Sequence, residues 1–302
     1  MSADNSVMLA SSNINQAAMN TQTLLSLPAE LIDAVAMDLK KRDLLSFRAT
    51  CRELRNRSAF ALCRNHLSIV WISGTSSSFQ DLTNLLLSPN LPQAQHFATI
   101  LGISAPYVDS GWPVDYADLR KRLLPSATDV ARLLEAMPNL VDIRLSQRQH
   151  PRLGDSSAVH YAPVLFRSLN TPAPLRPHLR ELFLAQTCID GSLLTGVLEM
   201  YKNSLKDVSF MNVTRTGKTS WLDIVKALHS TEVSSIKLML LESKDDSGER
   251  KHVMFSDEVC TAPYGEIHKE GIGSFYVRSK QVKSTLEAVL QSGDVYERDS
   301  FF

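Results

Sequence analysis

The sequence predicts a mixed α/β protein, in which a short module of three helices precedes an irregular α/β solenoid. Two observations predict this class. After residue 66, short β-like runs alternate with amphipathic helices, and the runs begin 26 to 42 residues apart. A strand–helix unit that recurs in this way cannot cover its own apolar face and stacks on its neighbours. The composition fits a folded chain, because 44% of the 302 residues are hydrophobic and only 21% are charged.

Shifts in composition divide the chain into four segments. Residues 1–22 are rich in Ser, Asn, Ala and Gln and have no apolar period, so we expect a disordered tail. The helical module follows at 23–66. Residues 67–292 form the strand–helix domain, and residues 293–302 are expected to be a C-terminal tail.

Apolar spacing and capping residues predict the three helices of the module. Leu31, Val35 and Leu39 recur every four residues after Pro28, which a first helical turn tolerates, so the first helix should cover about 28 to 39. Asp43 is a suitable N-cap for the second helix. Apolar residues at helical spacing continue through a second and a third helix to about Asn65; they are Leu44, Phe47, Cys51 and Leu54.

Six β-like runs share the form apolar-x-x-apolar-x-apolar. They begin at Leu67, Ala98, Leu140, Leu179, Leu205 and Val233. The run at Leu179 continues to Ile189 in the leucine-rich pattern, whereas the other runs lose that pattern after their third apolar position. The 39-residue interval that contains 146–178 is interpreted as an ordinary repeat carrying an inserted loop.

Helices are expected between the runs. Ser126 and Asp129 form a capping-box pattern at the start of a helix that Pro138 ends. Ser220 and Asp223 repeat this pattern, and a third helix follows Asp190. Near the C-terminus, Phe275–Val277 should form a last strand, and a closing helix should carry Val282, Leu286, Val289 and Leu290 before Gly293.

The segment from Leu24 to about Asn65 resembles an F-box, the helical module that binds the Skp-type adaptor of a cullin ubiquitin ligase. Three blocks carry the resemblance in order and spacing: Leu27-Pro28-x-Glu30-Leu31 followed by Val35 and Leu39, then Asp43-Leu44-Leu45-x-Phe47-Arg48, then Thr50-Cys51-Arg52-x-Leu54-Arg55. Leu54 departs from the family, in which many members have an aromatic residue there. The repeats that follow look like the leucine-rich-repeat substrate domain that is often joined to an F-box, as in fungal F-box proteins with degenerate repeats.

The resemblance implies an adaptor-binding surface on the module. The expected contact residues are Leu27, Pro28, Leu31, Leu44 and Leu45, which offer more apolar surface than three small helices bury internally. In the alternative interpretation, these side chains all face the repeats. Between Leu24 and His66 there are eight basic and five acidic residues, and a net charge of +3 would steer the module toward an acidic adaptor, although such a run is also typical of a solvated face.

The repeats would supply the surface for a protein target. Strand side chains alternate, so the residues between the buried apolar positions should lie on the open face of the sheet. From these positions we choose Arg144, Phe183, Met211 and Lys237 as candidate substrate-binding residues. In an equally good alternative, Phe183 and Met211 are covered by the 146–178 insert or by the C-terminal tail.

Several functions are disfavoured by charge and composition. The formal net charge is zero, which argues against nucleic acid as a partner. No run of 18 apolar residues occurs and the N-terminus does not resemble a signal peptide, so no membrane association is expected. The four cysteines are scattered and indicate reduced thiols, hence a cytoplasmic or nuclear location.

No motif indicates a catalytic, cofactor or metal site. Gly217-Lys218-Thr219 is not a phosphate-binding loop, because Asn212 stands where that loop needs a glycine. Cys63 and His66 have the spacing of a ligand pair but lack a second pair.

These observations predict a non-catalytic substrate receptor of a ubiquitin ligase, which binds a Skp-type adaptor and, through it, a cullin, and which holds an unknown protein substrate. The main alternative is a scaffold or binding protein that uses the F-box outside a cullin ligase. An enzyme with a divergent repeat-like fold is the third hypothesis, and it would need a cluster of convergent polar groups that the sequence does not indicate.

Overall fold

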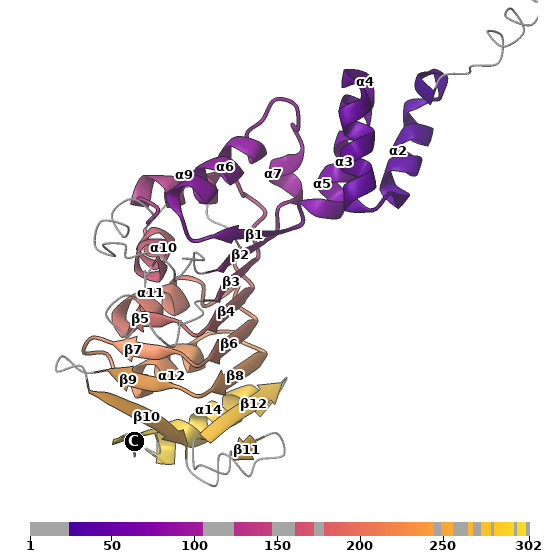
Figure 1. Ribbon diagram of the computed structural model, residues 1–302. Coiled ribbons are helices and arrows are strands. Elements are labelled where there is room, and N and C mark those ends of the chain that lie inside the picture. The colour runs from indigo at the N-terminus through magenta and orange to yellow at the C-terminus, as the bar shows by residue number, and fades with distance from the viewer. Residues whose placement is uncertain are drawn as a thin grey trace, which may run out of the picture. The chain divides into compact units, whose positions relative to one another are not determined.

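The computed structural model of the protein describes residues 24–104, 124–146, 161–171, 178–244, 249–255, 265–267, 273–278, 281–292 and 295–299. The chain divides into an N-terminal unit that ends at His66 and a C-terminal unit that starts at Leu67, the same boundary that the sequence predicts. Figure 1 labels the helices and strands of both units. The expected disordered tail, residues 1–22, lies outside the described residues.

Residues 24–66 of the N-terminal unit form four α-helices after a short 3₁₀ turn, so the expectation of three helices in this module was wrong. The elements are η1 (Leu24–Ser26), α2 (Ala29–Asp38), α3 (Lys41–Thr50), α4 (Arg52–Arg57) and α5 (Ala59–His66). Cys51 is extended, with φ of −158°, and ends the second helix early. Its Sγ accepts a hydrogen bond from the Leu54 backbone N at 3.5 Å, so Cys51 caps a new helix instead of continuing the old one. Lys40, and not Asp43, is the N-cap of α3.

The core of the N-terminal unit is small. Its buried apolar side chains are Ile32, Ala36, Leu44, Leu54, Ala61 and Cys63, and four partly buried side chains pack against the cluster of Ala36, Leu44 and Ala61: Met37, Leu39, Phe47 and Leu62. Ile32 and Ala36 are the buried residues of α2. Six buried apolar side chains, of which two are alanines, bury little apolar area, so this unit gains little stability from burial.

The C-terminal unit is built on a sheet whose first six strands are parallel and follow the chain order. They are β1 (Ile69–Ser73), β2 (Ile100–Ser104), β3 (Asp142–Ser146), β4 (Glu181–Ala185), β6 (Asp207–Met211) and β8 (Ser235–Met239). Each strand lies within or next to one of the six predicted runs. The register pairs the first residue of each strand with the first residue of its neighbour throughout. The apolar positions of the runs therefore form continuous buried rows, such as Leu101, Ile143, Leu182, Val208 and Ile236.

Helices connect the parallel strands, and Figure 1 shows α9, α10 and α11 on one side of the stacked strands. They are α6 (Ser76–Leu86), α7 (Ala94–Phe97), α9 (Ala127–Glu135), α10 (Ala162–Asn170), α11 (Gly191–Met200) and α12 (Trp221–Ser230). The predicted capping boxes are confirmed for α9 and α12, and the Asp190 side chain caps α11. The sequence thus located these helices through the residues that satisfy their first backbone N–H groups.

The expected loop in 146–178 contains a helix, which corrects the prediction. Pro163 lies in the first turn of α10, where the missing N–H has no cost. Leu165, Phe166 and Leu169 are buried on one face of this helix. The many prolines of the segment suggested a loop, but one of them only marks where the helix begins. Residues 147–160 and 172–177 lie outside the described residues.

A second sheet repeats the same intervals. Strands β5 (Cys188–Asp190), β7 (Thr214–Thr216) and β9 (Glu242–Lys244) are parallel and follow β4, β6 and β8. The residue directly after β4, β6 and β8 has a positive φ of 51 to 53°; these residues are Gln186, Asn212 and Leu240. Ile189 is the buried middle residue of β5, and the middle residues of β7 and β9, Arg215 and Ser243, are buried as well. The structural repeat therefore continues where the leucine-rich sequence pattern is lost.

The C-terminal end departs from the parallel arrangement. Strand β12 (Gly273–Arg278) pairs antiparallel with β8 and with β11 (Gly265–Ile267), and helix α14 (Gln281–Ser292) follows, as the sequence predicts for a strand and a closing helix. β13 (Val295–Asp299) pairs antiparallel with β10 (Arg250–Phe255), which also pairs with β9. The prediction of a C-terminal tail at 293–302 is therefore wrong for 295–299, because these residues complete the backbone hydrogen bonds along one edge of β10.

Candidate docking surfaces

One candidate surface lies on the N-terminal unit, where apolar side chains remain exposed. Leu31 is 50% exposed and Val35, one turn later on α2, is 43% exposed. On the helix they lie about 100° around the axis from the buried Ile32 and Ala36, each of which comes one position later. Leu45 on α3 is 48% exposed. These residues and the exposed Pro28, together with the half-buried Leu27, are called the helical apolar surface below.

Leu44 does not belong to this surface, which corrects the predicted set of adaptor-binding residues. Its side chain is 0% exposed and packs against Ala36 and Ala61 in the core. Leu44 and Leu45 are adjacent in a helix, so their side chains are about 100° apart around the axis, and only one of them can face the core. The sequence pair Leu-Leu could not indicate which one.

The exposed Val35 was not among the predicted contact residues. Its spacing of four from Leu31 predicts the helix, and Val35 also belongs to the F-box pattern, but neither observation indicates that its side chain is exposed. The apolar residues Ile32 and Ala36, one position further on, form the buried stripe instead. An apolar band on α2 that is wider than the core needs, with two stripes about 100° apart, is the signal that could have identified the surface.

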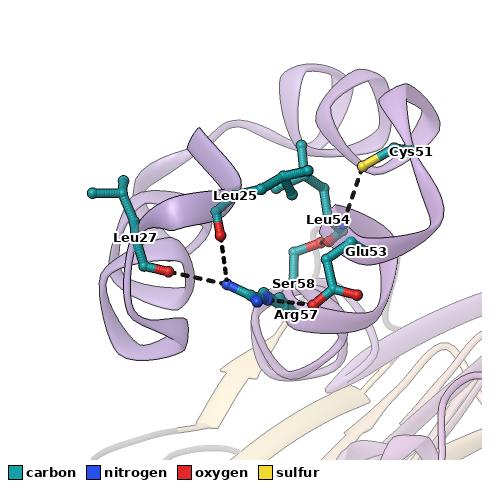
Figure 2. Close-up of polar contacts among 7 residues, drawn as sticks. All are labelled: Leu25, Leu27, Cys51, Glu53, Leu54, Arg57 and Ser58. Atoms are coloured by element: carbon teal, nitrogen blue, oxygen red, sulfur yellow. Dashed lines mark hydrogen bonds and ion pairs between the residues drawn. The ribbon is translucent and has the colours of Figure 1, made fainter. Parts of the chain in front are cut away.

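Arg57 fixes the segment that leads into α2, as Figure 2 shows. Its guanidinium Nη1 donates to the carbonyl oxygens of Leu27 at 3.0 Å and Leu25 at 3.3 Å, and its Nε donates to Glu53 Oε1 at 2.6 Å. The side chain of Leu27 points away from Arg57 in this view. Pro28 then begins the helix, because its carbonyl accepts hydrogen bonds from the backbone N of Leu31 and Ile32. A cation from α4 thus positions the Leu27-Pro28 pair.

A second arginine stabilises the α3–α4–α5 corner from inside. Arg48 is almost completely buried, and its Nη1 donates to the Arg55 carbonyl oxygen at 2.7 Å and to Ser58 Oγ at 3.2 Å. Burial lowers the pKa of Arg48, and burial also raises the pKa of the nearby Cys63 thiol. Arg48 and Ser58 together satisfy backbone oxygens at the break between α4 and α5, which explains why this buried corner tolerates polar residues.

The second candidate surface is the open face of the parallel sheet. Alternation along the strands is confirmed: within β4, β6 and β8 the second and fourth residues are buried, and the others are partly or fully exposed. Arg144, Phe183 and Lys237 occupy the same register row, with Ser209 on β6 between Phe183 and Lys237. Met211 lies in the next row, beside Ala185 and Met239. The register therefore brings together three of the four predicted substrate-binding residues and places the fourth one row away.

All four of these side chains are partly exposed. In the alternative interpretation, the 146–178 insert or the C-terminal tail covers Phe183 and Met211. Of these segments, residues 147–160, 172–177 and 300–302 lie outside the described residues, and β13 is paired with β10.

Trp71 was missed as a residue of this face. It lies on β1 and is 53% exposed, and its ring covers Gly102 on β2, where a Cβ would lie 2.3 Å from Trp71 Cδ2. Trp71, Gly102 and Arg144 follow one another in the same register row. Aligning the runs at Leu67 and Ala98 with the later runs would have placed Trp71 on the open face from sequence alone.

Other kinds of site find no support in the described part of the chain. No group of three or more His, Cys, Asp or Glu side chains is arranged to hold a metal ion in the described ranges. Within the same ranges, none of the helices combines the length and apolar character needed to cross a bilayer. Cys51, Cys63 and Cys188 are free thiols, and Cys260 lies outside the described residues.

No protein-family model matches this sequence, and no curated protein sequence matches it.

Proposed function

We propose that this chain is the non-catalytic substrate receptor of a Skp-cullin-F-box ubiquitin ligase. The N-terminal unit would act as the F-box and bind a Skp-type adaptor through the helical apolar surface. The C-terminal unit would act as an irregular leucine-rich-repeat solenoid and hold a protein target on its open sheet face, so that a separate conjugating enzyme reaches lysines of the target. Adaptor and cullin would meet the chain in the cytoplasm or nucleus.

The observation that carries this proposal is the helical apolar surface itself. Burial of Leu31, Val35 and Leu45 would stabilise a unit with so small a core, but these side chains are not buried within it. Exposed apolar side chains on a unit with an excess of basic residues fit an interface with an apolar centre and an acidic rim on the partner. The F-box pattern includes the residues that form this surface, and Arg57, just beyond the last block, holds the Leu27-Pro28 pair.

The test is adaptor binding by the intact chain and by a Leu31→Asp variant. Leu31 is exposed, so an aspartate there should leave the fold intact, whereas it would place an unpaired charge inside the proposed interface. We expect binding to a purified Skp-type adaptor, measured by biolayer interferometry, to weaken at least 30-fold, corresponding to about 2 kcal/mol. Arg57→Ala, which frees the Leu25–Leu27 segment, should weaken binding about tenfold.

Leu87→Asp is the matched control, because Leu87 is 54% exposed but lies at the C-terminal end of α6 in the other unit. It should bind the adaptor as the unchanged chain does. Equal binding by Leu31→Asp and the unchanged chain, or no adaptor binding at all, would contradict the proposal. If the adaptor binds and a cullin does not join the complex, the result supports the scaffold function and contradicts the ligase function.

A further inference from the structure

The in-register parallel strands arrange the outward side chains of the sheet in rows that run across the strands. The first row contains Ile69, Ile100, Asp142, Glu181, Asp207 and Ser235. The second row contains Trp71, Gly102, Arg144, Phe183, Ser209 and Lys237. The first row changes along the sheet from apolar on β1 and β2 to acidic on β3, β4 and β6.

The β1 end of this face is an exposed apolar patch. Ile69 is 51% and Trp71 is 53% exposed, and both belong to the edge strand of the sheet. Gly102 leaves room for the Trp71 indole to lie on the backbone of β2. A tryptophan ring held in this way is rigid and loses little conformational entropy when a partner covers it, which is the property of a binding anchor.

The middle of the face has an excess of negative charge. Asp142, Glu181 and Asp207 occupy the same row on three adjacent strands. Arg144 is the cation that opposes them: its Nη2 lies 2.6 Å from Asp142 Oδ2 and 3.6 Å from Glu181 Oε2. Three carboxylates against one guanidinium leave a local charge of about −2.

Two further observations show that this negative charge is not compensated within the described residues. Asp142 is only 2% exposed, and its Oδ1 has no hydrogen-bond partner. A buried carboxylate oxygen without a donor is costly, and native structures normally satisfy it. Burial raises the pKa of Glu181, and the neighbouring carboxylates Asp142 and Asp207 raise it further, while Arg144 only partly opposes them. Lys237, in the second row on β8, has no ion pair among the described residues.

We propose that this face binds an extended segment of a protein that places a lysine or arginine side chain against Glu181 and Asp207 and an apolar side chain against Trp71 and Ile69. The cation would relieve the repulsion among the three carboxylates, and the apolar side chain would remove the indole from water. This inference rests on the proposed function only in calling the segment part of a ligase target.

Strand spacing sets the distance between the two anchors in the bound segment. β1 and β4 are three strand intervals apart, and β1 and β6 are four, which corresponds to about 14 to 19 Å. An extended chain covers this distance in about four to six residues. The expected motif is therefore an apolar residue and a basic residue separated by roughly this number of positions. An acidic segment or a nucleic acid backbone would be repelled by the carboxylates.

The experiment is selection of a random 16-residue peptide library, displayed on phage, against the immobilised full chain. A parallel selection uses the Glu181→Gln, Asp207→Asn double variant, which keeps the size of both side chains and removes their charge. We expect peptides selected by the unchanged chain to be enriched in a basic residue near an apolar residue, and this basic enrichment should disappear with the double variant. A Glu135→Gln, Glu199→Gln variant is the control, since both residues are exposed on helices.

The affinity of an enriched peptide, measured by fluorescence anisotropy, provides the second arm. The double variant should bind this peptide at least tenfold more weakly. The unchanged chain should lose the same affinity when the basic residue of the peptide is replaced by glutamine, and combining the two changes should cause no further loss. Trp71→Ala should also weaken binding at least tenfold. The inference is overturned if no peptide is enriched, if the enriched peptides lack a basic residue or are acidic, or if the double variant binds them equally well.

Adaptor binding by the same preparations separates this inference from the proposed function. The double variant should bind the Skp-type adaptor normally, because its changes lie in the C-terminal unit. Selective peptide binding by a chain that does not bind the adaptor would support the sheet-face site and contradict the ligase function. Adaptor binding without selective peptide binding would support the ligase function and contradict the sheet-face site.

Discussion

Single residues determine how the backbone turns at places where the sequence pattern gives little guidance. Arg57 reaches back over 30 residues to hold the carbonyl oxygens of Leu25 and Leu27, and Arg48 occupies the inside of a helical corner. The F-box pattern includes Arg48 but does not indicate that its guanidinium is buried. Predicting such contacts requires the fold, because both partners come from segments that are distant in sequence.

The positive φ of the residue after β4, β6 and β8 restricts which residue can stand there, and the effect on the free energy of unfolding can be measured. Asn212 has φ of 53°, a conformation that asparagine tolerates and that β-branched residues avoid. Asn212→Val should therefore lower the free energy of unfolding by about 1–2 kcal/mol, and Asn212→Gly should change it by no more than about 0.5 kcal/mol. Urea unfolding of the two variants measures the difference.

Asn84→Val on α6 is the control for this prediction. Asn84 is exposed and helical, and asparagine and valine have similar helix propensities, so the exchange should be nearly neutral. If Asn212→Val is as stable as Asn212→Gly, the left-handed turn does not constrain the sequence.

At the scale of elements, capping residues fix both the start of helices and their contacts with one another. Asp129 belongs to the capping box of α9 and also accepts hydrogen bonds from Ser76 Oγ at 2.9 Å and Gln80 Nε2 at 3.0 Å on α6. Desolvation by itself would raise the pKa of Asp129, but hydrogen bonds from Gln80, Ser126 and Ser76 outweigh it and lower the pKa to about 2. One carboxylate on α9 thus joins this helix to α6.

This lowered pKa predicts a pH-dependent contribution to stability. Because the folded pKa lies below the unfolded value of about 3.9, the ionised group stabilises the fold at neutral pH, and the contribution is lost as the pH falls from about 4 through 2. Asp129→Asn should be less stable than the unchanged chain by about 1 kcal/mol at pH 7, and this difference should shrink as the pH approaches 2. Urea unfolding at several pH values measures it.

Asp81→Asn is the control, since Asp81 is exposed on α6. Its effect on the free energy of unfolding should be small at pH 7. A stability difference for Asp129→Asn that stays constant between pH 7 and pH 2 would show that the ionised carboxylate is not what joins α6 to α9.

At the scale of the whole molecule, the two units differ greatly in the cores that stabilise them. The N-terminal unit has the small cluster around Leu44, and the C-terminal unit has continuous buried rows across the parallel strands from β2 to β8. We therefore expect two separate unfolding transitions, of which the N-terminal unit gives the earlier. Residues 1–66 contain no Trp or Tyr, so tryptophan fluorescence follows only the C-terminal unit, whereas far-UV circular dichroism follows both.

Paired truncations test this expectation. Leu44→Ala should lower the free energy of unfolding of the N-terminal unit, measured from the earlier dichroism transition, by about 2–5 kcal/mol. It should leave the tryptophan transition unchanged. Leu184→Ala, at a position that is equally buried in β4, should shift the tryptophan transition. A single transition, which both substitutions move by the same amount with both probes, would mean that the units unfold together.

The sequence by itself determined the order of elements and most of their positions. Local chemistry was sufficient for this: Ser126 with Asp129 and Ser220 with Asp223 satisfy helix N-termini, and six apolar runs match six strands in register. It also determined that alternate strand residues face outward, because the period of two is a property of the backbone.

Only the tertiary structure decided which of several equivalent apolar residues are buried. Leu44 is in the core and Leu45 is exposed, and Ile32 rather than Leu31 is the buried residue of α2. It likewise placed Val295–Asp299 in a strand, joined the carboxylates of Asp142, Glu181 and Asp207 in one row, and laid Trp71 over Gly102. The physical reason is the same in each case: these outcomes depend on partners that are far away in the chain, and a local pattern contains no information about them.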